Sequence, residues 1–191
     1  MKKIMMTLTA VFCCAMAISV LSSCSKSDDN GGGGAAAPAA AADTTPVSVK
    51  VSFVAGVTDD LGQYADVTVE YMDGSGTVKS EKVNGAAWTK EITAQLPAKL
   101  GVRVSYAKKE GVDYKQLAKI KTGAAIVHAY VLLNKAGSVL KNVASATADL
   151  GSVDVPGDQI EKYIDAKGKN AKTLLLEYDA KGNQTTGTWK D

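Results

Sequence analysis

The stretch VSVKVSF, residues 47–53, alternates strictly between apolar and polar side chains. A period of two places alternate residues of an extended chain on opposite faces. The apolar face would carry Val47, Val49, Val51 and Phe53. The stretch therefore predicts a half-buried β-strand at the start of a folded domain.

The same alternation returns downstream between short turns. DVTVEY (66–71) and VKSEKV (78–83) flank MDGSGT, whose Asp and Gly residues suit a tight hairpin turn. A further strand follows Asn84 and Gly85 and ends at Pro97, and GVRVSY (101–106) predicts another. The inward residues expected on these two strands are Trp88, Ile92, Ala94, Leu96, Val102, Val104 and Tyr106.

Helical signals are few and short. Asp113, with Gln116 three residues later, resembles a helix cap and predicts one or two helical turns within residues 112–122. Ile160, Tyr163, Ile164 and Lys167 have the spacing of one helical face, and this segment lies between Pro156 and Gly168. The second segment is the better helix candidate.

The remaining segments complete an all-β pattern. AAIVHAYVLL (124–133) is apolar on both faces, as expected for a central strand that is covered on both sides. SVLKNVASATADL (138–150) predicts a strand with an irregular end, and residues 171–189 predict a strand, a turn and a last strand. VEYMDGSG and LEYDAKGN are similar, either through a duplication that has diverged or, as we favour, because the same hairpin chemistry is repeated. The predicted fold is an immunoglobulin-like antiparallel β-sandwich with one or two short helices.

The chain begins with MKK and continues with apolar or weakly polar residues to Leu21, which is typical of a secretory signal. The run of about 18 residues is also at the lower limit for a membrane span. Leu21-Ser22-Ser23-Cys24 resembles the lipobox of bacterial lipoproteins. This resemblance implies that residues 1–23 are removed and that Cys24 carries diacylglycerol. Acyl chains of that size would hold the protein on a membrane without a membrane-spanning helix.

The residues after Cys24 extend this resemblance. Ser25, Lys26, Ser27, Asp28 and Asp29 resemble the export tag of surface-exposed lipoproteins of Bacteroidetes. The resemblance implies an outer-membrane protein that faces the cell exterior, although acidic and Ser residues are also common in tethers. Residues 30–45 contain no large apolar side chain and predict a disordered linker, which together with residues 25–29 has a reach of roughly 25 Å. The folded domain is predicted to be residues 46–191.

Composition excludes several classes of function. The three cysteines lie at or before residue 24, so the predicted domain contains no thiol and no disulfide. Of 22 basic residues, the signal removes Lys2 and Lys3, which leaves 20 against 20 acidic residues. Arg103 is the sole arginine. A neutral domain of this kind lacks the clustered basic surface that a nucleic-acid partner needs.

Catalytic and metal-binding residues are scarce. His128 is the only histidine and lies within an apolar strand, so we predict a structural role and no enzyme activity. Without a His or Cys cluster, a structural zinc site and other cofactors are not expected. Asp59, Asp60, Asp73 and Asp179 are interpreted as turn residues. Carboxylates that a glycosidase could pair are scattered over Glu70, Glu81, Glu91, Glu161 and Glu177.

Two tryptophans are candidates for recognition. Trp88 begins an apolar face and is predicted to lie in the core. Trp189 lies among small and polar residues, where it is either an edge-strand residue that closes the sandwich or an exposed platform for stacking.

These observations favour a non-enzymatic surface lipoprotein whose sandwich binds or supports an envelope component. A glycan-binding accessory module is the alternative. A fimbria-type subunit is less favoured, since the N-terminal region has no arginine for trypsin-like processing. The expected partners are the membrane, through the lipid, and a glycan or an envelope protein.

Overall fold

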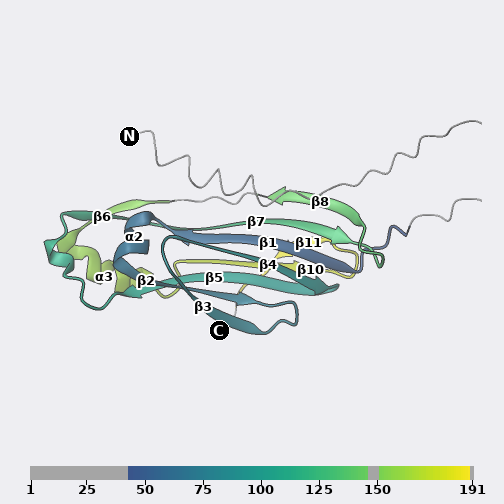
Figure 1. The fold of residues 1–191 in the computed structure, drawn as a ribbon, viewed down its shortest axis with the longest axis horizontal. Coiled ribbons are helices and arrows are strands. Elements are labelled where there is room, and N and C mark those ends of the chain that lie inside the picture. Colours follow the sequence, from purple (N-terminus) through teal and green to yellow (C-terminus); the bar gives the residue numbers. More distant parts are fainter. Residues whose placement is uncertain (1–42, 146–150, 190–191) are drawn as a thin grey trace, which may run out of the picture. The chain divides into compact units, whose positions relative to one another are not determined.

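The computed structural model describes residues 43–145 and 151–189. Figure 1 shows that these residues are mostly extended and are arranged in layers. The strands are β1 (Ser48–Val57), β2 (Ala65–Met72), β3 (Val78–Val83), β4 (Ala87–Gln95), β5 (Ala98–Lys108), β6 (Lys119–Thr122), β7 (Ala124–Leu133), β8 (Val139–Ser145), β9 (Val153–Pro156), β10 (Lys172–Tyr178) and β11 (Gln184–Thr186). The helices are α2 (Asp59–Tyr64), α3 (Gly157–Lys167) and the single 3₁₀ turn η1 (Tyr114–Gln116).

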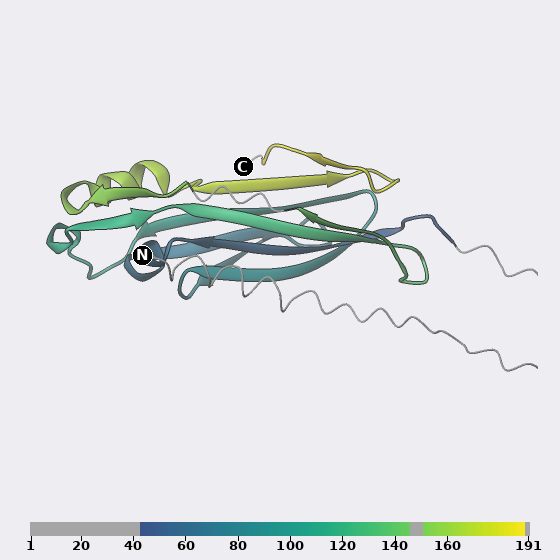
Figure 2. The ribbon, with the colours of Figure 1, turned by 90° about the horizontal axis from the view of Figure 1, so that it is seen from above.

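Nine of these strands form the two sheets of a sandwich. The four-stranded sheet has the order β4-β1-β7-β8, and the five-stranded sheet has the order β11-β10-β5-β2-β3. All neighbours within the sheets are antiparallel, and β6 pairs with β9 in a separate ribbon. Figure 2 shows the arrangement turned by 90°. The predicted all-β antiparallel sandwich with short helices is confirmed.

The alternating stretch that begins at Val47 lies where its pattern predicts. Val49, Val51 and Phe53 are at most 1% exposed on the inner face of β1, whereas Val47 precedes the strand and is half-buried. Val69 of β2 and Val104 of β5 are fully buried on the opposing sheet. Burial of such side chains, at about 25 cal/mol per Å² of apolar surface, is the main contribution to the stability of the sandwich.

Three hairpins share one five-residue turn, at residues 73–77, 134–138 and 179–183. In each turn the first residue is Asp73, Asn134 or Asp179, and its Oδ1 accepts a hydrogen bond from the backbone N–H of the fifth residue. The fourth residue is a glycine with φ between 77° and 81°, a conformation that favours glycine. The turn also occurs in β7–β8, outside the two similar segments, which supports a repeated hairpin design.

The helix predicted within residues 112–122 is wrong over most of its length. Asp113 does cap a turn, since its carboxylate accepts from the N–H of Lys115, but the helical part ends at Gln116. Residues 119–122 instead form strand β6, in which Ile120 and Thr122 are buried. Pairing with β9 provides backbone hydrogen bonds that a four-residue segment cannot supply by itself.

The interpretation of Asp59 and Asp60 as turn residues is also wrong. They begin helix α2, whose single buried residue is Leu61. The Asp60 carboxylate accepts a hydrogen bond of 2.6 Å from the N–H of Lys121. This long-range contact, which fixes the start of α2 against β6, has no local sequence signal.

The other predicted helix is confirmed as α3. Ile160 and Ile164 are at most 2% exposed, and the helix runs from Pro156 at its N-cap to Gly168 at its C-cap. It packs near η1, β5, β6 and β9 at the end of the sandwich that also carries α2 (Figure 1).

The signal, lipobox and export-tag predictions lie outside the described residues, as do the linker prediction up to residue 42 and the part of the predicted 138–150 strand that follows Ser145. Within residues 43–145 and 151–189, none of the helices has the length and apolar character needed to cross a bilayer.

Candidate binding surface around Trp189

Trp189 follows β11 and lies on the outer face of the five-stranded sheet. Gly101 of β5 is paired in register with Leu175 of β10, next to the paired core residues Leu100 and Leu176. Side chains alternate across a strand, so positions 101 and 175 face away from the core. The N–H of Gly187 donates to the carbonyl of Leu175 at 3.0 Å, which holds the C-terminal segment over this face.

Gly101 provides the space that the indole occupies. A Cβ atom at this position would lie 2.7 Å from Cζ3 of Trp189 and 2.8 Å from Cδ1 of Leu175. Glycine in the interior of a strand often marks such a close approach. The indole is half-buried as a result, with an apolar contact on the sheet and part of its surface in solvent.

Arg103 is the charged neighbour of the indole. Its guanidinium carbon lies 5.2 Å from the centroid of the Trp189 ring, within the range of a cation–π interaction. Its Nε donates to the Glu70 carboxylate at 2.5 Å, and a longer contact of 3.4 Å reaches Oδ1 of Asn170. With 16% of its side chain exposed, Arg103 is held in one position by groups on three segments.

We use the name Trp189 surface for Trp189, Gly101, Arg103, Glu70 and Asn170. The surface combines a partly exposed aromatic ring with planar polar groups whose charges are paired. A ligand that stacks on the indole would meet a guanidinium, a carboxylate and an amide at its edge. These groups suit a polar, uncharged ligand, because a charged one would have to compete with the Arg103–Glu70 ion pair.

The structure refines the two expectations for Trp189. The residue follows the edge strand β11 and does not lie in it, and its half-buried indole keeps part of its surface in solvent. Sequence neighbours such as Thr188 gave no sign of its apolar contacts, because Gly101 and Leu175 reach it only through the fold.

Trp88 lies in the core, as predicted, and is part of a polar cluster. Its ring centroid is 5.4 Å from that of Tyr71, and its Nε1 donates to Glu81 at 2.7 Å. The same carboxylate accepts from Tyr71 Oη at 2.8 Å and from Lys90 Nζ at 2.6 Å. We call Tyr71, Glu81, Trp88 and Lys90 the Glu81 cluster. It joins β2 and β3 of one sheet to β4 of the other.

Hydrogen bonds determine the ionisation of Glu81. Donation by Lys90, then by Trp88 and Tyr71, lowers the pKa of this carboxyl from its usual 4.5 to about 2. All of these donors stabilise the charged form. The cluster thus keeps a carboxylate ionised at the boundary between the two sheets.

His128 is buried, as predicted for a structural histidine. It is directly opposite Phe53 on β1 and shares its inward face, with the ring centroids 6.5 Å apart. Only 3% of the residue is exposed, and neither ring nitrogen has a hydrogen-bond partner within the described residues. Burial lowers the pKa of the imidazole below 6.5, so the side chain is neutral.

The scattered carboxylates have separate roles. Glu70, Glu81, Glu91 and Glu177 form ion pairs with four different cations. Asp73 and Asp179 use their carboxylates inside turns, as predicted, and hydrogen bonds lower the pKa of both. Among the described residues, no group of three His, Cys, Asp or Glu side chains is placed to hold a metal ion.

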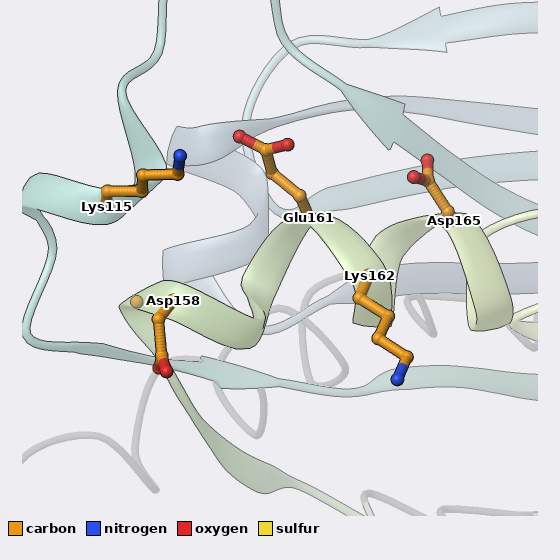
Figure 3. A pocket seen from close by; sticks show the side chains of 6 residues that line it. Lys115, Asp158, Glu161, Lys162 and Asp165 are labelled. Carbon is orange, nitrogen blue, oxygen red and sulfur yellow. The ribbon is translucent and has the colours of Figure 1, made fainter.

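Glu161 contributes to a groove of about 340 Å³ between η1 and α3. Figure 3 shows that Lys115 points toward Glu161, while Lys162 extends to the other side of the helix. The lining residues are Lys115, Gly157, Asp158, Glu161, Lys162 and Asp165. The charges are mixed, and no aromatic or apolar side chain of the described part of the chain lines the groove, so it is a weaker candidate than the Trp189 surface.

Comparison of the chain with protein-family models and with curated proteins finds no match. The assignment of function therefore depends on the residues themselves. Sequence reasoning identified Trp189 but missed Gly101, Glu70 and Asn170 as its surroundings. The glycine within GVRVSY was the one available signal, because a glycine inside a strand marks a close approach.

Proposed function

We propose that the protein is a non-enzymatic, lipid-anchored module of the bacterial outer envelope that binds a partner through the Trp189 surface. The observation that carries the binding part is the half-buried indole on Gly101, held beside Arg103. Aromatic and arginine side chains of this kind are enriched where proteins recognise ligands. The anchor part depends on the lipobox, Leu21-Ser22-Ser23-Cys24, and the tag that follows it.

The anchor is tested by changing Cys24 to Ala. The thiol is the expected acceptor of the lipid, so the variant should remain an uncleaved or mislocalised precursor, whereas the wild type is found in the outer membrane. Protease added to intact cells should release the wild-type domain. A wild-type protein that is cut only after lysis would instead face the periplasm, and the proposed surface exposure would be wrong.

Glycan binding is the second candidate, and the paired charges of the Trp189 surface favour it. Sugar rings stack on indoles, and their hydroxyl groups both donate and accept hydrogen bonds, which suits the Arg103–Glu70 pair and the Asn170 amide. Binding of the purified protein to an array of glycans would support this candidate. Binding to an envelope protein in the absence of any glycan binding would favour the general proposal.

A further inference from the structure

Asn84 and Gly85 form the connection between β3 and β4, and both are exposed. Gly85 has a φ of 101°, and within residues 43–145 and 151–189 no atom outside its chain neighbours lies within 4 Å of the position of a Cβ. In the part of the chain that the structure describes, neither the Asn84 amide nor the N–H of Gly85 has a hydrogen-bond partner. The side-chain amide and the following backbone nitrogen are therefore free to approach each other.

We propose that Asn84 is a site of spontaneous deamidation in the folded protein. The backbone nitrogen of Gly85 attacks Cγ of Asn84, and an N–Cγ bond forms. The Cγ–Nδ2 bond breaks, and Nδ2 leaves as ammonia with the proton that the Gly85 nitrogen gives up. Water then opens the five-membered succinimide at either of its carbonyl groups. The products are aspartate or isoaspartate, and the second diverts the main chain through Cγ.

Gly85 makes this reaction accessible at Asn84. With no Cβ, its nitrogen can approach Cγ without steric hindrance, and its backbone can adopt the conformations that ring closure requires. A residue with a side chain would restrict both. The reaction needs no enzyme and no reactant other than water, so an exposed extracellular domain would undergo it gradually.

At other candidate positions in the domain, hydrogen bonds or packing of the side chain and backbone oppose ring closure. The Asn134 amide donates to the Asp43 carbonyl at 2.8 Å and accepts from the N–H of Ser138 at 2.8 Å. Nδ2 of Asn183 donates to Asp179 at 2.8 Å. In the sequence Asp73-Gly74, the carboxylate accepts from two backbone N–H groups of its own turn, and Gly74 packs against the Thr93 carbonyl.

The modification would affect more than one exposed turn. A Cβ on Gly62 of α2 would lie 2.8 Å from the carbonyl carbon and oxygen of Gly85, so helix and connection are in close contact. The N–H of Val57 donates to the Ala86 carbonyl at 2.8 Å. An isoaspartate lengthens the main chain immediately before these contacts. We therefore expect it to loosen α2 and the end of β1.

Incubation of the purified full-length protein at mildly alkaline pH, followed by peptide mapping, tests the proposal. We expect the mass increase of an amide-to-acid conversion, with isoaspartate, at Asn84. Conversion there should be at least roughly tenfold faster than at Asn134 or Asn183, a difference of about 1.4 kcal/mol in barrier. The incubated wild type should then melt at a lower temperature than an incubated Asn84→Gln variant.

Incubation in urea provides the control. The unfolded chain should convert at Asn84 in any case. An Asn84 that converts in urea but stays intact in the folded protein would overturn the proposal, because the fold would then protect it. Equal conversion at Asn84, Asn134 and Asn183 in the folded protein would overturn the argument that the local structure selects the site.

Discussion

Replacement of His128 by Phe or Leu should stabilise the protein by about 1–3 kcal/mol at neutral pH, the usual cost of a buried polar group without a partner. Among the residues that the structure describes, neither ring nitrogen of His128 has a hydrogen-bond partner. Phe is close to His in shape. Leu serves as a second variant because it does not introduce the six-membered ring of Phe, which is larger than the imidazole. Unfolding in urea, followed by intrinsic fluorescence, measures the change.

The difference should increase as the medium becomes acidic. Because the folded-state pKa of His128 is lowered, the unfolded state binds the proton first. The stability that depends on the neutral imidazole is fully present above pH 6.5. It decreases as the pH falls below 6.5, by at most about 1.4 kcal/mol per pH unit. Neither variant should show this decline. If both variants are less stable than the wild type at neutral pH, His128 has a polar partner and the account of its burial is wrong.

Replacement of Glu81 by Ala should destabilise the protein by about 2–4 kcal/mol. The change removes the acceptor of Tyr71 and Trp88, which are 5% and 8% exposed, and each unpaired buried donor costs about 1–3 kcal/mol. The Lys90 ion pair adds little, since 37% of the Glu81 side chain is exposed to solvent. Glu91→Ala is a matched control on the outer face of β4, and its effect should stay below about 1 kcal/mol.

The Glu81 cluster should also make the stability of the protein depend on pH in a second, more acidic range. Its contribution is fully present above pH 4.5 and is lost as the pH falls toward 2, since folding lowers the pKa of this carboxyl. Denaturant unfolding between these two values should show a smaller acid dependence for Glu81→Gln than for the wild type. Equal acid dependence of the two proteins would mean that Glu81 is not ionised within the cluster.

The core of the fold could be predicted because its signals are local. Period-two alternation located Val49, Val51 and Phe53, and helical spacing located Ile160 and Ile164. The turns that begin at Asp73 and Asp179 could be predicted because a glycine lies three positions later in each, and glycine readily adopts a positive φ. In each case the signal lies within a single strand, helix or turn.

The features that prediction missed depend on contacts between distant segments. Strand β6 exists through its pairing with β9, and the start of α2 is bound to the N–H of Lys121. The Trp189 surface joins Gly101, Glu70 and Asn170 from separate elements, and none of them marks the others in sequence. Trp189 itself was identified, but its half-buried position was not, because Gly101 lies 88 residues earlier.

The central claim is that the Trp189 surface is the binding face, and the affinity of Trp189→Ala for uncharged glycans on an array tests it most directly. Stacking on an indole contributes about 1–3 kcal/mol, so we expect affinity to fall at least roughly fivefold while stability falls by about 1–2 kcal/mol for this half-buried side chain. Glu91→Ala, on the other sheet, should bind like the wild type. Unchanged affinity of Trp189→Ala, or an equal loss in Glu91→Ala, would contradict the claim.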